Sequence, residues 1–129
     1  MPLVRIDTLT GRPGRPRGFG EKVGDVIYRT MMDTLNVPPA DNFRIATEHA
    51  PDGLTYDPAY LDIDRTDGIV MIQITLNQGR TTEMKQSFFA LLTDRLHDEL
   101  GVRTEDVFVS LVEVSKENWS FGNGIAQYA

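Results

Sequence analysis

The sequence contains no cysteine, and this absence excludes several kinds of chemistry at once. Without thiols the chain has no disulfide framework, no thiolate nucleophile and no cysteine-based metal site. Its apolar runs are all too short for a signal-peptide core or a membrane span, so we expect a cytoplasmic protein with no membrane partner. Metal-ligand spacings and phosphate-binding loops are missing as well, and we therefore expect neither a metal nor a cofactor.

Positive charge is also scarce: 13 Lys and Arg residues stand against 19 Asp and Glu residues, for a net charge of −6. A chain with this balance is a poor partner for nucleic acid. A small anionic substrate would have to be held by locally placed arginines, against the overall field. In other respects the 129 residues, 40% apolar and 25% charged, are those of one ordinary globular domain spanning 1–129.

The most informative stretch is the beginning, where Pro2 follows Met1 and runs without a linker into the apolar-alternating segment 3–8. Loss of Met1 would leave a secondary amine at the end of a rigid strand. Such an amine can act as a base, as an acid, or as a nucleophile that passes through an iminium, and burial and neighbouring charge decide which. Many chains begin with Met-Pro, however, so other residues must indicate whether the amine is used.

Hydrophobic periodicity predicts four strands and two helices, in the order strand, helix, strand, strand, helix, strand. We expect strands at about 3–8, 42–49, 69–76 and 107–114, and helices at about 20–35 and 81–100. The segment 69–76 is apolar almost throughout and rich in β-branched residues, which predicts a strand buried on both faces. The tail from Trp119 to Gly124 predicts a tight C-terminal hairpin.

The two halves of the chain follow one pattern: a strand, Gly-Arg, a helix, Val, Asp and a second strand. The matching residues are Gly11, Arg12, Val37 and Asp41 in the first half and Gly79, Arg80, Val102 and Asp106 in the second. We therefore predict an α+β fold made of two βαβ repeats, about 1–50 and 67–115, followed by the hairpin. Such repeats would form a four-stranded sheet with both helices on one face. Because the other face would be apolar and bare, we predict a homotrimer in which copies of the chain cover it.

Together these features resemble the tautomerase superfamily, whose members use an amino-terminal proline. Three motifs resemble its malonate semialdehyde decarboxylase-like subgroup in particular: Val37-Pro38-Pro39-Ala40-Asp41, Glu48-His49-x-Pro51 and Asn118-Trp119-Ser120-Phe121-Gly122-x-Gly124. The resemblance covers nearly the whole chain. It implies trimers of duplicated subunits, active sites at the proline end of the sheet, and small oxo-carboxylates as substrates.

Residue by residue, the resemblance places the subgroup's catalytic aspartate on Asp41 and its aromatic pocket wall on Trp119 and Phe121. Each assignment has a plainer alternative, because an aspartate at the start of a strand is also a good cap and aromatic residues also suit a core or a subunit contact. Asp106, the counterpart of Asp41, has no proline beside it and serves as an internal control. Near Pro2, a carboxylate favours the protonated amine and arginines favour the neutral one.

A planar guanidinium is the best partner for the carboxylate of an oxo acid, so the predicted anchor is Arg80, reinforced by Arg12. Arg80 matches the second of two arginines that the subgroup spaces Arg-x-Arg after its third strand. The first falls on Gln78, or on Asn77 if the strand shifts by one residue, and this departure counts against malonate semialdehyde decarboxylation. Related dehalogenases place a histidine on the first helix where this chain has Tyr28. We take Gln78 and Tyr28 as substrate-binding positions.

Two classes of function remain open on this evidence. The first is a cofactor-free enzyme for small oxo-carboxylates, either a keto-enol tautomerase or a decarboxylase or hydratase, with Pro2 as its working group. The second is a non-catalytic binding or regulatory protein on the same fold, in which Pro2 is vestigial.

Overall fold

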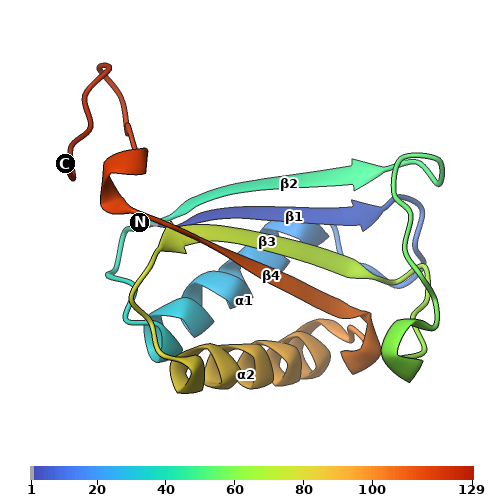
Figure 1. The fold of residues 1–129 in the computed structure, drawn as a ribbon. Coiled ribbons are helices and arrows are strands. Elements are labelled where there is room, and N and C mark those ends of the chain that lie inside the picture. Colours follow the sequence, from blue (N-terminus) through green and yellow to red (C-terminus); the bar gives the residue numbers. More distant parts are fainter. Residues whose placement is uncertain (1) are drawn as a thin grey trace.

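The computed structural model describes residues 2–129, which form two layers: one sheet lies over two helices (Figure 1). The elements are β1 (Leu3–Leu9), α1 (Phe19–Thr34), β2 (Phe43–His49), β3 (Val70–Asn77), α2 (Thr82–Leu100) and β4 (Val107–Val114). Three single turns of 3-10 helix join them: η1 (Tyr60–Asp62), η2 (Thr104–Asp106) and η3 (Lys116–Asn118). All six long elements predicted from the sequence are therefore confirmed, with ends shifted by at most one residue.

The sheet has the strand order β2-β1-β3-β4. Each βαβ repeat pairs its own two strands in parallel, and the repeats join through the antiparallel pair β1 and β3. The duplication extends to the register, because Leu3 lies opposite Phe43 in the first repeat and Met71 lies opposite Phe108 in the second. One consequence matters for function: the start of β1, the start of β2, the end of β3 and the end of β4 all lie at one end of the sheet (Figure 1).

The core lies between the sheet and the helices. Each helix buries one apolar face against the sheet: α1 buries Val23, Val26, Ile27 and Met31, and α2 buries Phe88, Leu92 and Leu96. Alternate residues of the two central strands close the core from above, namely Val4, Ile6, Val70, Ile72, Ile74 and Leu76. The N-terminus of α2 is capped by Thr81, whose side chain accepts a hydrogen bond from the Met84 N–H, and the helix ends at Gly101 in the left-handed region.

The open face of the sheet differs from the prediction. The sequence predicts an apolar open face that copies of the chain cover, but two of the residues that β3 presents there, Gln73 and Thr75, are polar. In the single chain Gln73 is exposed, and Met71 and Thr75 are half-buried. That face is mixed rather than apolar: it exposes large apolar side chains, Phe43, Ile45, Phe108 and Val112, among polar ones. The apolar run in the sequence was misleading because Met71 is the only large apolar side chain that β3 presents there.

The C-terminal segment is the second correction. No strand forms in residues 115–129, so the predicted hairpin of paired strands is wrong. After η3 the chain projects beyond the sheet and turns back on itself (Figure 1). The turn is held by Gln127, whose Oε1 accepts from the Phe121 N–H at 2.9 Å and whose Nε2 donates to the Gly122 oxygen at 2.9 Å. A side-chain amide here replaces the strand ladder that a hairpin would have used.

Two further findings complete the fold. Residues 50–69 form an ordered loop at the opposite end of the sheet, where Leu54 and Tyr56 pack on Leu9, Ile69 and Met71. Within residues 2–129, no helix combines the length and the apolar character needed to cross a membrane.

Candidate active site

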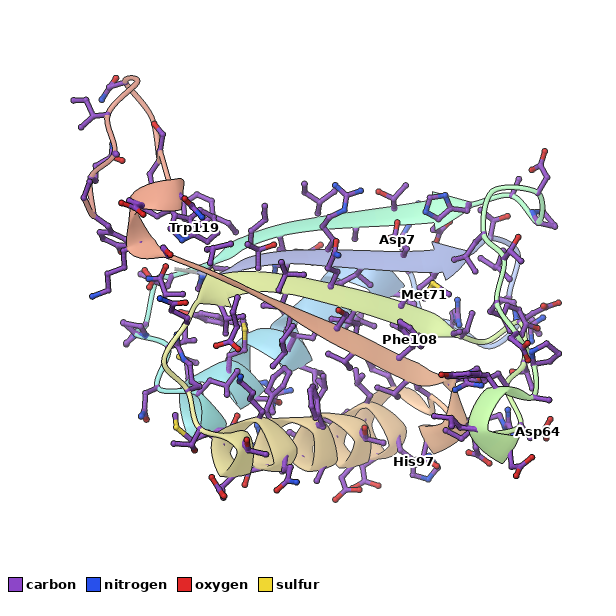
Figure 2. All side chains as sticks on the ribbon, viewed as in Figure 1. Asp7, Asp64, Met71, His97, Phe108 and Trp119 are labelled. Carbon is purple, nitrogen blue, oxygen red and sulfur yellow. The ribbon has the colours of Figure 1, made fainter. Side chains whose placement is uncertain are left out.

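Pro2 lies in a cavity of about 270 Å³ at the end of the sheet where β1 begins. The residue is buried, and the cavity around it is lined by Leu3, Phe43, Trp119, Ser120 and Phe121. Figure 2 shows Trp119 at this end, well away from Asp64 and His97 at the other. The volume is slightly below the usual range for drug-sized ligands, which suits a small substrate. The structure therefore brings together three of the predicted site residues: Pro2, Trp119 and Phe121.

The aromatic wall of this cavity is an ordered stack. The rings of Trp119 and Phe121 are nearly parallel, with centroids 5.3 Å apart and planes 17° apart. Tyr128 meets the Phe121 ring at a steep angle of 68°, with centroids 5.0 Å apart. The indole Nε1 of Trp119 donates a hydrogen bond of 2.8 Å to the Oδ1 of Asn77. Stacking and this hydrogen bond together orient a wall that would otherwise be a loose tail.

Arg80 follows the end of β3 at the same end of the sheet. Its Nε donates to the Leu35 oxygen at 3.0 Å and its Nη1 donates to the Asn77 oxygen at 3.1 Å, so backbone carbonyls orient the guanidinium. The side chain is half-buried, and within residues 2–129 it forms no ion pair with a carboxylate. A partly buried cation oriented in this way, with Nη2 still free to donate, is suited to an anionic ligand.

Asp41 lies in the segment that leads into β2, two residues before Phe43, the register partner of Leu3. It is half-buried, and its N–H donates to the Pro38 oxygen at 3.3 Å. Tyr28, predicted to bind substrate, supports this segment from α1: its hydroxyl accepts a hydrogen bond from the Ala40 N–H. Tyr28 is not among the residues that line the Pro2 cavity.

Gln78 lies at the same end as Pro2, but its side chain is exposed. Its N–H donates to the Val114 oxygen at 3.0 Å and so continues the β3–β4 ladder by one residue. Like Asp41 and Arg80, Gln78 is close in the fold to the Pro2 cavity without lining it.

Arg12 is the predicted residue that the fold of one chain keeps apart from Pro2. It follows β1, whose seven residues span roughly 20 Å, so it lies at the opposite end of the sheet. Its neighbour Arg15 is structural: its Nη2 donates to the Gly68 oxygen at 2.9 Å and its guanidinium lies over the Phe19 ring. Burial, and then the charge of Arg12, lowers the pKa of Arg15. Arg12 can serve a Pro2 only if another copy of the chain supplies it.

Asp106, the counterpart of Asp41 in the second repeat, is a structural residue. It is 1% exposed, and its carboxylate accepts from the Thr66 N–H at 2.8 Å and from the Thr66 hydroxyl at 2.6 Å. Those bonds join the loop that precedes β3 to η2. In the first repeat β1 begins at Leu3, so Asp41 has no corresponding loop to bind. His49, for which the sequence offered no role, pairs with Asp7 at 2.7 Å between Nε2 and Oδ1 at the end of the sheet away from Pro2.

Sequence reasoning missed the cavity-lining residues Leu3, Phe43 and Ser120, and it did not foresee the contact between Asn77 and Trp119. Register supplies the missing signal for two of them: in parallel strands that start together, Leu3 and Phe43 share a face and an end. No local pattern predicts that the tail folds back over them.

Comparison with known proteins decides the family. The model of the family described as "Tautomerase enzyme" matches residues 41–122, which is more than half of the chain. The chain belongs to the tautomerase family. "Probable tautomerase YusQ" of Bacillus subtilis (strain 168) is 42% identical over 127 residues and covers 98% of each chain. "Probable tautomerase YrdN" of the same strain is 34% identical and covers 99% of this chain and 96% of its own.

Solved structures extend the match to the malonate semialdehyde decarboxylase-like subgroup. This tautomerase-family chain is 29% identical to malonate semialdehyde decarboxylase, with a TM-score of 0.85 over 98% of this chain and 95% of that one. It is 35% identical to FG41 malonate semialdehyde decarboxylase inhibited by 3-bromopropiolate, with a TM-score of 0.86 over 98% and 93%. A symmetric trimer of fused 4-OT shares the fold, with 19% identity and a TM-score of 0.75. Family and subgroup together identify a tautomerase-type enzyme.

Proposed function

We propose that this protein is a cofactor-free enzyme that uses the amine of Pro2, freed by removal of Met1, to tautomerise small oxo-carboxylates between keto and enol forms. One observation carries the proposal: Pro2 is buried in a small cavity roofed by the stacked rings of Trp119 and Phe121. A proline placed there merely as the second residue of a chain would not require such a cavity.

The steps follow from the groups at this end of the sheet. Arg80 holds the substrate carboxylate, since its guanidinium has donors left and no carboxylate partner within residues 2–129. The neutral Pro2 nitrogen accepts the proton from the enol oxygen, and the protonated amine returns a proton to the carbon, so the enzyme ends unchanged. Trp119 and Phe121 keep water out, which strengthens the electrostatic interactions inside.

Charge near the amine determines its protonation state. Arg80 favours neutral Pro2, the base form, whereas Asp41 favours the protonated form. A proton relay needs both the neutral and the protonated amine to be accessible. Arg80 and Asp41, which favour opposite forms, lie at the same end of the sheet as Pro2. Gln78 in place of a second arginine moves the balance toward the protonated amine.

A second candidate is decarboxylation of a β-oxo acid, supported by the similarity to the two solved decarboxylases. There the bond between the carboxylate carbon and the α-carbon breaks, and its electron pair moves toward the carbonyl, which protonated Pro2 polarises. Carbon dioxide leaves, and the resulting enolate takes up a proton. The leaving carboxylate has to be held and desolvated, and the neutral side chain of Gln78 makes that harder than enolisation.

The test compares mass-verified protein with and without Met1. Substrates are phenylpyruvate and 2-hydroxymuconate for tautomerisation, and malonate semialdehyde for decarboxylation. We expect turnover from the processed form alone, because Met1 makes the Pro2 nitrogen a tertiary amide with neither basicity nor nucleophilicity. Full activity with Met1 in place would contradict the role of Pro2. A processed, folded protein that turns over none of the three would instead support a binding role.

A further inference from the structure

Asn77 lies where the anchor and the aromatic wall of the site meet. It is the last residue of β3 and is half-buried. Its backbone oxygen accepts from Arg80 Nη1 at 3.1 Å, and its side-chain Oδ1 accepts from Trp119 Nε1 at 2.8 Å. The mechanism above uses Arg80 and Trp119 but gives no role to the residue that contacts both.

The fold explains why this one residue touches both groups. β3 and β4 are parallel and end together, with Asn77 opposite Val114, and the Gln78 N–H extends that ladder to the Val114 oxygen. The turn η3 then brings the chain back so that Trp119 lies over the end of β3. An indole has a single polar group, an N–H donor, and Asn77 supplies its acceptor.

We propose that Asn77 is a positioning residue that holds Trp119 over Pro2 and ties this wall to Arg80, thereby setting the affinity for substrates with an aromatic body. The inference rests on the proposed function, because it concerns the same cavity. Trp119 faces the body of a substrate rather than its reacting atoms. Loss of its hydrogen bond therefore weakens binding in the ground state and the transition state alike, which raises KM and leaves kcat nearly unchanged.

The first experiment needs no activity, because Trp119 is the chain's one tryptophan and its emission reports on this position alone. We expect Asn77→Ala to shift the emission to longer wavelength and to increase quenching by acrylamide, since the indole is no longer held. Asn77→Asp keeps an acceptor oxygen and should restore the emission of the original protein. Asn118→Ala, a change at an exposed asparagine next to the tryptophan, is the matched control and should change neither signal.

The second experiment measures kinetics on protein without Met1. A neutral hydrogen bond of this kind corresponds to about a three- to tenfold change, so Asn77→Ala should raise KM for phenylpyruvate by that factor. KM for 2-hydroxymuconate, which has no ring, should rise less. Asn77→Asp should recover most of the loss. Trp119→Phe removes the hydrogen-bond donor. In that background Asn77→Ala should raise KM hardly any further, because both changes break the same hydrogen bond.

The outcomes separate this inference from the proposed function. An active enzyme whose emission and KM are both unchanged in Asn77→Ala overturns the inference and leaves the function standing. Altered emission with unchanged KM also overturns it, since Asn77 would then hold the tail without serving the site. If the processed protein turns over no substrate, the proposed function fails together with the kinetic part, and the emission alone decides whether Asn77 holds Trp119.

Discussion

At the candidate site, the side chains of Arg80 and Gln78 differ in how firmly the surrounding structure holds them. Carbonyl oxygens of Leu35 and Asn77 orient Arg80 and leave part of its guanidinium free. The Gln78 side chain is exposed and is held only through its backbone. The proposed anchor, Arg80, is therefore held in one orientation, whereas position 78 can be changed at little structural cost.

We predict that Arg80→Ala lowers kcat/KM on any carboxylate substrate. The expected loss of transition-state stabilisation is about 2 to 5 kcal/mol, the range for a lost partner in a buried charge pair. Steady-state kinetics on processed protein measure the loss. The control is Arg29→Ala, which removes the same charge from an exposed ion pair with Glu99 on the helix surface and should have little effect. Equal losses from both changes would show that Arg80 acts through overall charge and not as an anchor.

We also predict that Gln78→Arg raises decarboxylation of malonate semialdehyde selectively. A second cation helps to hold the leaving carboxylate, while enolisation needs one anchor and a proton relay. The exposed position has room for the longer side chain. The ratio of decarboxylation to phenylpyruvate tautomerisation is the measurement, and an unchanged ratio would remove Gln78 from the account of specificity.

Among the helices and strands, α2 has the clearest local boundaries. Thr81 caps its first turn through a hydrogen bond of 3.2 Å from the Met84 N–H, and Gly101 ends it with φ of 69°. Glu83 in the first turn and His97 in the last also suit the helix dipole. Because α2 lies beneath β3 and β4 (Figure 1), its stability supports the end of β3, where Asn77 lies and after which Arg80 follows.

We predict that Thr81→Ala lowers the free energy of unfolding by about 1 kcal/mol, the usual cost of a lost N-cap. Thr82→Ala is the matched control, since Thr82 is exposed and lies one residue inside the helix. Urea unfolding at a single protein concentration provides the measurement, because assembly would make the midpoint depend on concentration. Equal losses from both variants would mean that the cap contributes nothing.

At the scale of the whole molecule, Arg12 and the open face of the sheet would gain a role only if copies of the chain assemble. One chain leaves large apolar side chains exposed on both edge strands of that face, Phe43 and Ile45 on β2 and Phe108 and Val112 on β4. It also keeps Arg12 at the end of the sheet opposite Pro2. Contacts between copies would cover the exposed apolar side chains of the open face. They would also let Arg12 of one chain reach the Pro2 cavity of another.

We therefore predict a homotrimer, with a mass in solution three times the 14.5 kDa of one chain. Light scattering at micromolar concentration tests this, and a stable monomer would remove the basis of the assembly. In a trimer, Arg12→Ala should raise KM for carboxylate substrates only if the subunits share their sites. Mixing Arg12→Ala chains with inactive Arg80→Ala chains would then recover part of the activity.

Local sequence was sufficient for the elements of this protein, because helices and strands follow from the spacing of apolar residues and from caps such as Thr81 and Gly101. It was also sufficient for the duplication, whose marker residues recur in order in both repeats.

The open face was misjudged, since an apolar run such as 69–76 does not reveal which residues face solvent. The tail was misjudged because Gly122-Asn123-Gly124 specifies a turn without specifying paired strands. Only the tertiary structure decided that Trp119 contacts Asn77 beside Pro2 and that the carboxylate of Asp106 accepts hydrogen bonds from Thr66. It also decided that Arg12 lies at the end of the sheet opposite Pro2. These are contacts between residues far apart in the chain, and the strand register and chain reversal that bring them together leave no local pattern in the sequence.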